Sequence, residues 1–169
     1  EIGYSDTVSH EIVESVFGSF QFEYYVDHGH DTVLRDYMGV VGISFQNDWD
    51  IFLSYQDDFH IPYHNTSQGF GLTYNRQNRF KSWRINYSHG VFQDTPFDEY
   101  RLSKPFKLAE RWTNDLTALL RQEDRDDGYE NVWIWRNESE YTFSWEGRLK
   151  LTLEATSDRA YKRTLLFAY

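Results

Sequence analysis

The sequence predicts an all-β protein, an antiparallel up-and-down meander of about ten strands that forms a transmembrane β-barrel or part of one. Apolar and polar residues alternate along most of the chain, and a strand places alternate side chains on opposite faces. In residues 148–156, three leucines and an alanine alternate with charged residues and threonines. A helix would not separate these two sets, so the alternation indicates strands.

The whole chain, 1–169, has the length of one domain. The run Leu116 to Leu120 has helical propensity, but its neighbours alternate, and we therefore predict a strand there. We expect strands over residues 11–26, 33–46, 49–58, 68–77, 81–92, 99–108, 111–122, 130–144, 147–156 and 160–169.

Composition excludes several classes of protein. The absence of cysteine removes disulfides, thiolate metal sites and cysteine nucleophiles. The net charge of -10 argues against nucleic-acid binding, which needs clustered Lys and Arg. No apolar run approaches the roughly 20 residues of a membrane helix, a criterion that does not apply to alternating barrel strands. Aromatic residues make up 19% of the chain, a high fraction that a disordered chain would not carry.

The predicted connections differ in length. Those expected to be short lie near residues 47–48, 77–80, 109–110 and 145–147, and those expected to be longer lie near 27–31, 59–67, 93–98, 123–129 and 157–159. Consecutive hairpins would place all the short turns at one end of the sheet. This asymmetry is typical of outer-membrane barrels.

Four tryptophans accompany the predicted short turns. Trp49, Trp83 and Trp112 follow such turns closely, and Trp145 lies within one. Tryptophan favours a membrane interface because its ring is apolar while its N–H reaches water. We therefore assign these four residues to the membrane interface, as one of two aromatic girdles. Nearer the opposite end lie Tyr24, Tyr55, Tyr100, Trp133 and Tyr161. A core of aromatic residues in a soluble sandwich is the alternative.

The polar face of the predicted strands carries many charges, which a wet barrel lumen accepts more readily than a sandwich core does. A single sheet with one solvated face would accept them equally. In a narrow lumen we expect ion pairs across the interior. The residues predicted to face the lumen are Arg84, Arg101, Asp115, Arg121, Arg136, Glu138, Arg148, Lys150 and Glu154.

Candidate metal ligands fall in predicted loops. His28, His30, His60 and His64 have no evident partner geometry, and the acidic run 123–128 lacks the glutamate that completes a calcium loop. We therefore expect no metal and no other cofactor.

A pair of carboxylates, Glu138 and Glu140, lies about 7 Å apart on one face of a predicted strand. This separation is within the range that glycosidases use. Arg136 shares the same face, and ion pairing is the simpler explanation. We therefore do not expect an enzyme, although catalysis by lumen carboxylates remains a third alternative.

The C-terminal run 162–169 resembles the terminal signal of bacterial outer-membrane barrel proteins. Phe167 and Tyr169 match the alternating aromatic positions of that signal, while Thr164 replaces its glycine. The resemblance implies an outer-membrane location.

The wider stretch 112–169 is similar to the barrel region of an uncharacterised bacterial envelope family, in which a carbohydrate-binding-like domain precedes the barrel (domain of unknown function 5916). The resemblance rests on residues 120–125 and 163–167. It implies a barrel fold with one more strand after Tyr169, but no particular activity.

These patterns favour an outer-membrane β-barrel with a structural, transport or channel role. Its expected partners are the lipid bilayer and either other envelope proteins or further strands of the same chain, and not nucleic acid. A second interpretation remains open, a soluble β-sandwich that binds carbohydrate through exposed Trp and Tyr. Trp133 and Trp135 share one strand face and would stack on sugar rings.

Overall fold

A computed structural model describes residues 2–8, 10–26, 32–60, 62–125, 128–143, 147–157 and 164–168. These residues form eleven strands in one sheet, and no helix among them has the length and apolar character needed to cross a membrane. The strands are β1 (Ile2–Thr7), β2 (Val13–Val26), β3 (Thr32–Phe45), β4 (Trp49–His60), β5 (Tyr63–Tyr74), β6 (Trp83–Phe92), β7 (Thr95–Ala109), β8 (Trp112–Arg125), β9 (Gly128–Thr142), β10 (Arg148–Thr156) and β11 (Thr164–Ala168).

The strands pair in sequence order, and every described pairing is antiparallel. This confirms the predicted all-β meander, to which β1 is an addition. Residues 116–120 lie inside β8, as their alternating neighbours predict. Each described strand therefore pairs only with its neighbours in the sequence, and the period-two pattern decides which face each side chain occupies.

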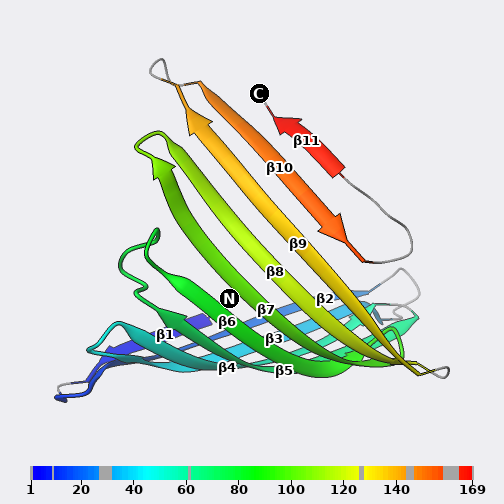
Figure 1. Ribbon diagram of the computed structural model, residues 1–169. Helices are drawn as coiled ribbons and strands as arrows, with labels where there is room; N and C mark the ends of the chain where they lie inside the picture. Colours follow the sequence, from blue (N-terminus) through cyan, green and yellow to red (C-terminus); the bar gives the residue numbers. More distant parts are fainter. Residues whose placement is uncertain are drawn as a thin grey trace.

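The sheet is strongly curved and open (Figure 1). Within the described ranges, β1 pairs only with β2 and β11 only with β10, so the two edge strands do not meet. A closed barrel is therefore not formed by these residues. The curvature turns the sheet into a trough with a convex and a concave face.

The predicted asymmetry of connection lengths is wrong. Two residues each separate β4 from β5, β6 from β7 and β8 from β9, where longer loops were expected. The connection expected to be short near 77–80 instead spans residues 75–82. Between β6 and β7, Gln93 and Asp94 both have positive φ, which is the conformation of a two-residue type I′ hairpin turn. The described parts of 59–67, 93–98 and 123–129 are largely paired strand ends, whereas residues 27–31 and 158–159 of the other predicted loops lie outside the described residues.

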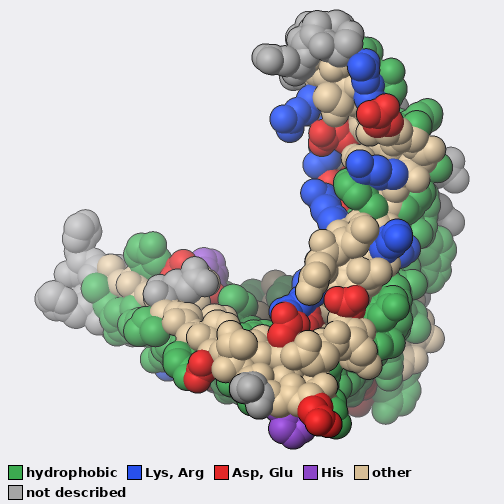
Figure 2. All heavy atoms as spheres, turned by 90° about the vertical axis from the view of Figure 1, so that its left-hand side faces the viewer, with side chains coloured by type: hydrophobic (Ala, Val, Ile, Leu, Met, Phe, Trp, Pro, Cys, Tyr) green, Lys and Arg blue, Asp and Glu red, His purple; other side chains and the backbone are tan. Residues whose placement is uncertain are grey.

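The two faces of the sheet differ in chemistry. Cross-strand register aligns an apolar row on one face, consisting of Val16, Ile43, Ile51, Leu72, Ile85, Leu102, Ala118 and Trp135. Figure 2 shows hydrophobic side chains on the convex side and charged side chains along the concave side of the upright arm. Among the described residues, Phe97 is the only buried large hydrophobic side chain. The apolar face therefore has no protein layer packed against it.

Rings lie over glycines on the concave face of the early strands. A Cβ built on Gly71 would lie 2.0 Å from the Phe52 ring, and one on Gly42 would lie 2.3 Å from the Phe17 ring. Only glycine leaves room for a ring to lie flat on the neighbouring strand. Side chains therefore project only a short distance from the concave face of β2 to β5 at these positions.

Candidate functional site

All nine charged residues predicted to face a lumen lie on the concave face. The register shows this because directly paired residues share a face. One continuous row of cross-strand neighbours consists of Thr73, Arg84, Ser103, Thr117, Arg136 and Glu154. The other predicted residues stand at even spacings from this row along their strands. The nine residues therefore share one face, as predicted, but this face belongs to an open sheet.

Ion pairs connect β9 with β10 along this face. The pairs are Lys150 Nζ to Glu138 Oε2 at 2.6 Å, Arg136 Nη2 to Glu154 Oε2 at 2.5 Å and Arg148 Nη1 to Glu140 Oε1 at 4.0 Å. They join adjacent strands, whereas the sequence predicted pairs across a lumen. Each pair remains partly solvated, so each contributes less than about 1 kcal/mol to stability. The two carboxylates considered for catalysis are both held in such pairs.

Two further predicted residues lie nearer the turns that precede β4, β6, β8 and β10, the tryptophan end of the sheet. Arg84 donates from Nε to Thr73 Oγ1 at 3.2 Å, and its guanidinium lies 5.8 Å from the Phe52 ring centroid. Asp115 lies 3.6 Å from Arg79 of the β5–β6 connection. Thus the charged face contacts both the early strands and the turns.

Glu99 is the most enclosed charged side chain of the later strands, with 7% exposure. Arg101 donates to its Oε1 at 2.9 Å, and Arg121 donates to its Oε2 at 2.7 Å from Nη2 and 3.1 Å from Nε. The Arg121 guanidinium also lies 4.7 Å from the Phe97 ring centroid and 5.4 Å from that of Phe92. One carboxylate therefore fixes two guanidinium groups against an aromatic surface.

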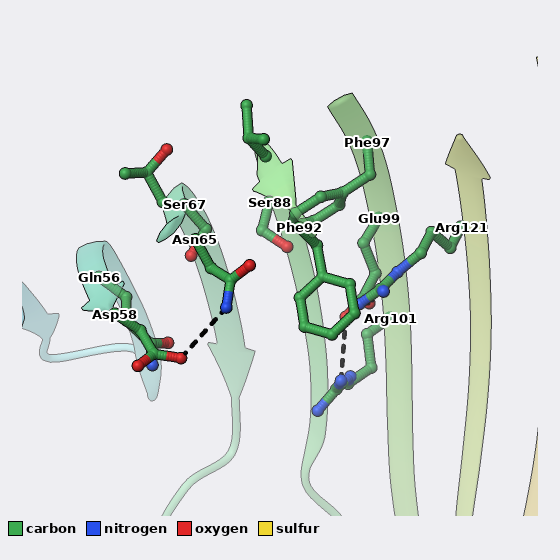
Figure 3. Close-up of a pocket in the computed structure, with 12 residues that line it drawn as sticks. Gln56, Asp58, Asn65, Ser67, Ser88, Phe92, Phe97, Glu99, Arg101 and Arg121 are labelled. Carbon is green, nitrogen blue, oxygen red and sulfur yellow. Dashed lines mark hydrogen bonds and ion pairs between the residues drawn. The ribbon is translucent and has the colours of Figure 1, made fainter. Parts of the chain in front are cut away.

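A pocket with a volume of 280 Å³ adjoins this cluster at the end of the sheet opposite the tryptophans (Figure 3). Its second wall comes from β4 and β5, where Asn65 donates to Asp58 Oδ2 at 3.3 Å. Ser67 of β5 and Ser88 of β6, the strand between the two walls, also line the pocket. The pocket thus combines carboxylate, amide, hydroxyl, guanidinium and aromatic groups.

The three described tryptophans of the predicted interface lie on the convex face at one end of the sheet. Trp49 contacts Trp83 with ring centroids 5.2 Å apart and Tyr74 at 4.8 Å. Trp112 contacts Tyr141 at 6.5 Å and donates from Nε1 to Ser139 Oγ at 2.7 Å. Their shared position follows from the hairpin order. Trp145 and Tyr161 lie outside the described residues.

A polar belt crosses the convex face at the opposite end. Asp98 accepts a hydrogen bond from Tyr87 Oη at 2.6 Å and lies 3.1 Å from His89 Nδ1. Asp57 similarly lies 3.1 Å from both Arg35 and His64. The aromatic residues Tyr100 and Trp133 stand one cross-strand row closer to the tryptophan end. The apolar band is therefore bounded by tryptophans on one side and by hydrogen-bonded polar groups on the other.

The histidines have a different setting from the expected loops. His60 ends β4 and His64 lies in β5, while His28 and His30 fall outside the described residues. Across the described ranges, no group of three or more His, Asp or Glu side chains is arranged to hold a metal ion.

The pocket combines two predicted residues, Arg101 and Arg121, with groups that the sequence did not point to, above all Glu99 and Asp58. The latter two residues lie at the edges of segments predicted as loops, at 93–98 and 59–67. The period-two spacing between Glu99 and Arg101 was a usable signal, because it places both residues on one strand face.

Comparison of the chain with models of protein families, with curated proteins and with solved structures finds no match.

Proposed function

We propose that the chain forms part of an outer-membrane β-barrel, with its convex face against lipid and its concave face lining a polar lumen. The observation that carries the proposal is the apolar convex face without a packed layer. Val41 and Leu53, at the centre of this face, are 60% and 57% exposed. A soluble protein rarely exposes so extensive an apolar surface, and lipid would cover it.

The boundaries of the apolar band support a bilayer location. On β2, outward residues from Val16 to Tyr24 cover about 26 Å along the strand, and a tilt of about 40° reduces this to about 20 Å across a membrane. This is close to the apolar height of about 25 Å in outer-membrane barrels. Tryptophans at one boundary and hydrogen-bonded polar groups at the other match a girdled band.

Further strands are part of the proposal. The edges at β1 and β11 would leave backbone N–H and C=O groups unpaired, and unpaired groups in hydrocarbon cost several kcal/mol each. Additional strands, from the same chain or from another envelope protein, would pair with these edges and close the barrel. The concave face would then line a channel for small hydrophilic solutes.

The convex face offers little to a carbohydrate. Trp133 and Trp135 line a hollow of 690 Å³ whose other walls are almost entirely apolar, including Leu102, Ala118 and Leu120. Sugar hydroxyl groups require hydrogen-bond partners when they leave water. The lining therefore favours an acyl chain over a sugar ring.

Site-directed spin labelling tests the proposal directly. The chain contains no cysteine, so each single substitution by cysteine gives one labelled position. In lipid vesicles, labels at Leu149, Leu151 and Leu153 should collide with dissolved oxygen. Labels at Lys150 and Thr152 should collide instead with a water-soluble nickel chelate. Water access at all five positions would contradict the proposal.

A planar-bilayer recording tests the lumen assignment. In the closed assembly, Arg84→Glu and Lys150→Glu should both shift ion selectivity towards cations, because charges lining a pore determine which ions enter. A substitution on the convex face, Ile85→Leu, is the matched control. Conductance that is indifferent to both charge reversals would remove these residues from the lumen.

A further inference from the structure

The two walls of the concave pocket carry opposite charge. Asp58 makes the β4–β5 wall negative. A second carboxylate, that of Asp36, stands directly opposite it on β3. On the β7–β8 wall, two arginines surround the single carboxylate of Glu99, which leaves one net positive charge. We propose that this pocket binds a short zwitterionic peptide, its ammonium group at Asp58 and its carboxylate at Arg101.

The negative wall is held in place with a free acceptor. Asn65 bonds Asp58 through Nδ2, and its own Oδ1 accepts from the Gln93 backbone N–H at 2.8 Å. This fixes the amide between the strand and the turn. Within the described part of the chain, Asp58 Oδ1 accepts no hydrogen bond from another side chain. A peptide ammonium group would satisfy it.

The positive wall has unused donors. Arg101 bonds Glu99 through Nη2, while its side chain remains 46% exposed. Its other guanidinium nitrogens can therefore bind a carboxylate, a geometry for which guanidinium is well suited. Arg121 has fewer N–H groups available for a ligand, because it donates twice to Glu99 and lies over the rings of Phe92 and Phe97. Arg101 is thus the recognition group and Glu99 the group that positions it.

The ligand must bridge a diagonal across the pocket. Three strand intervals, about 14 Å at the usual spacing, separate β4 from β7, and Arg101 shares a cross-strand row with Phe52, six residues before Asp58. The side chains of Asp58 and Arg101, which both line the pocket, cover part of this diagonal. A chain of two residues spans about 7 Å when extended. Phe92, 42% exposed, offers a surface for an apolar side chain. Ser67 and Ser88 offer hydroxyl groups to the peptide amide.

The charge pattern also disfavours ligands that carry only one sign of charge. An anion alone would be repelled by Asp58, and a cation alone by the arginines. A neutral sugar would hydrogen-bond to these groups but would leave both charges without an opposite charge. The inference rests on the proposed function only in requiring that the concave face be open to water.

Calorimetry on the full chain in detergent tests the inference with defined probes. Alanyl-phenylalanine should bind, and both its N-acetylated and its C-amidated forms should bind about tenfold more weakly, equivalent to about 1.4 kcal/mol. Asp58→Asn should weaken binding of the parent dipeptide but cause no further loss for the acetylated form. Arg101→Gln should show the same relation with the amidated form. Arg148→Gln, which changes a largely exposed arginine of the same face outside the pocket, is the control.

Three outcomes would overturn the inference: no binding of the dipeptide, equal binding of the blocked forms, or tighter binding of maltose than of the dipeptide. The blocked ligands need no substitution, so misfolding of a variant cannot produce these results. Failure of this test with the spin-label alternation intact would leave the proposed barrel standing. Failure of the alternation with specific binding intact would overturn the membrane location alone.

Discussion

The concave face differs between the early strands β2–β5 and the later strands β7–β10. In the early strands it carries small residues such as Ser19, Ser54 and Gly69, with two phenylalanine rings lying flat on glycines. In the later strands it carries long charged side chains joined in ion pairs. The convex face is apolar in both regions. We infer that the surroundings of the convex face are uniform, whereas the early and later strands fill the concave side differently.

The largest expected effect tests the uniform convex face. Leu53→Lys in β4 and Leu151→Lys in β10 should each destabilise the protein in vesicles by about 2–4 kcal/mol, since each places a charge in the lipid band. Urea unfolding followed by tryptophan fluorescence measures the loss. The neighbouring concave substitution Lys150→Leu is the control and should cost much less. Equal stability of Leu53→Lys and wild type would show that the two regions face different surroundings.

The next effect is confined to the early strands. Gly71→Ala should cost about 2–3 kcal/mol, because the added Cβ would meet the Phe52 ring and overpack the concave face. Adding Phe52→Ala should remove most of the penalty specific to Gly71→Ala, which a double-mutant cycle measures. Gly39→Ala is the control, because its Cβ would lie 3.9 Å from the nearest side chain. An additive cycle would show that the ring is not the obstacle.

A smaller effect is expected at the centre of the charged region. Glu99→Gln should cost about 2 kcal/mol in unfolding free energy, because two arginines lose their shared carboxylate on a largely enclosed surface. The partial exposure of both arginines keeps the loss below that of a fully buried pair. Glu99→Asp should lose less stability than Glu99→Gln. A neutral effect of Glu99→Gln would mean that the cluster adds no stability.

The smallest effect separates exposed ion pairs from the enclosed one. Glu138→Gln should lower the free energy of unfolding by less than about 1 kcal/mol, because the side chains of Glu138 and its partner Lys150 are both more than a third exposed. The loss should shrink further when unfolding is repeated at high salt, because salt screens exposed charges. A loss as large as that of Glu99→Gln would contradict the difference in burial.

Alternation was sufficient to predict the strands that combine leucine with charge. In 148–156 the apolar residues lie on one face and the charged residues and threonines on the other, so the residue type alone indicates the face. The same is true of 83–88. The faces of the nine charged residues followed from this pattern alone. The partners of those residues did not, because an ion pair depends on the register between two strands and not on one strand.

The strand ends could not be predicted from polarity. Segments 59–67, 93–98 and 123–129 contain Asp, Asn, Gly or Pro, which are typical of loops. Backbone hydrogen bonds nonetheless pair most of the described residues of these segments, since a ladder does not depend on whether its side chains are apolar. The pocket lies among these polar strand ends, and Asp58 and Glu99 stand at the ends of the predicted strands 49–58 and 99–108, where alternation alone does not indicate a site.

The strictly consecutive order of the strands has a consequence for folding kinetics. Every described strand pairing joins neighbours in the sequence, so each hairpin can form with only a short loop closure. Such a topology keeps contact order low, and folding can proceed by adding one hairpin to the last. A pause would leave an unpaired strand as the growing edge at any stage. Refolding should therefore show intermediates that differ in length by whole hairpins and retain native pairing.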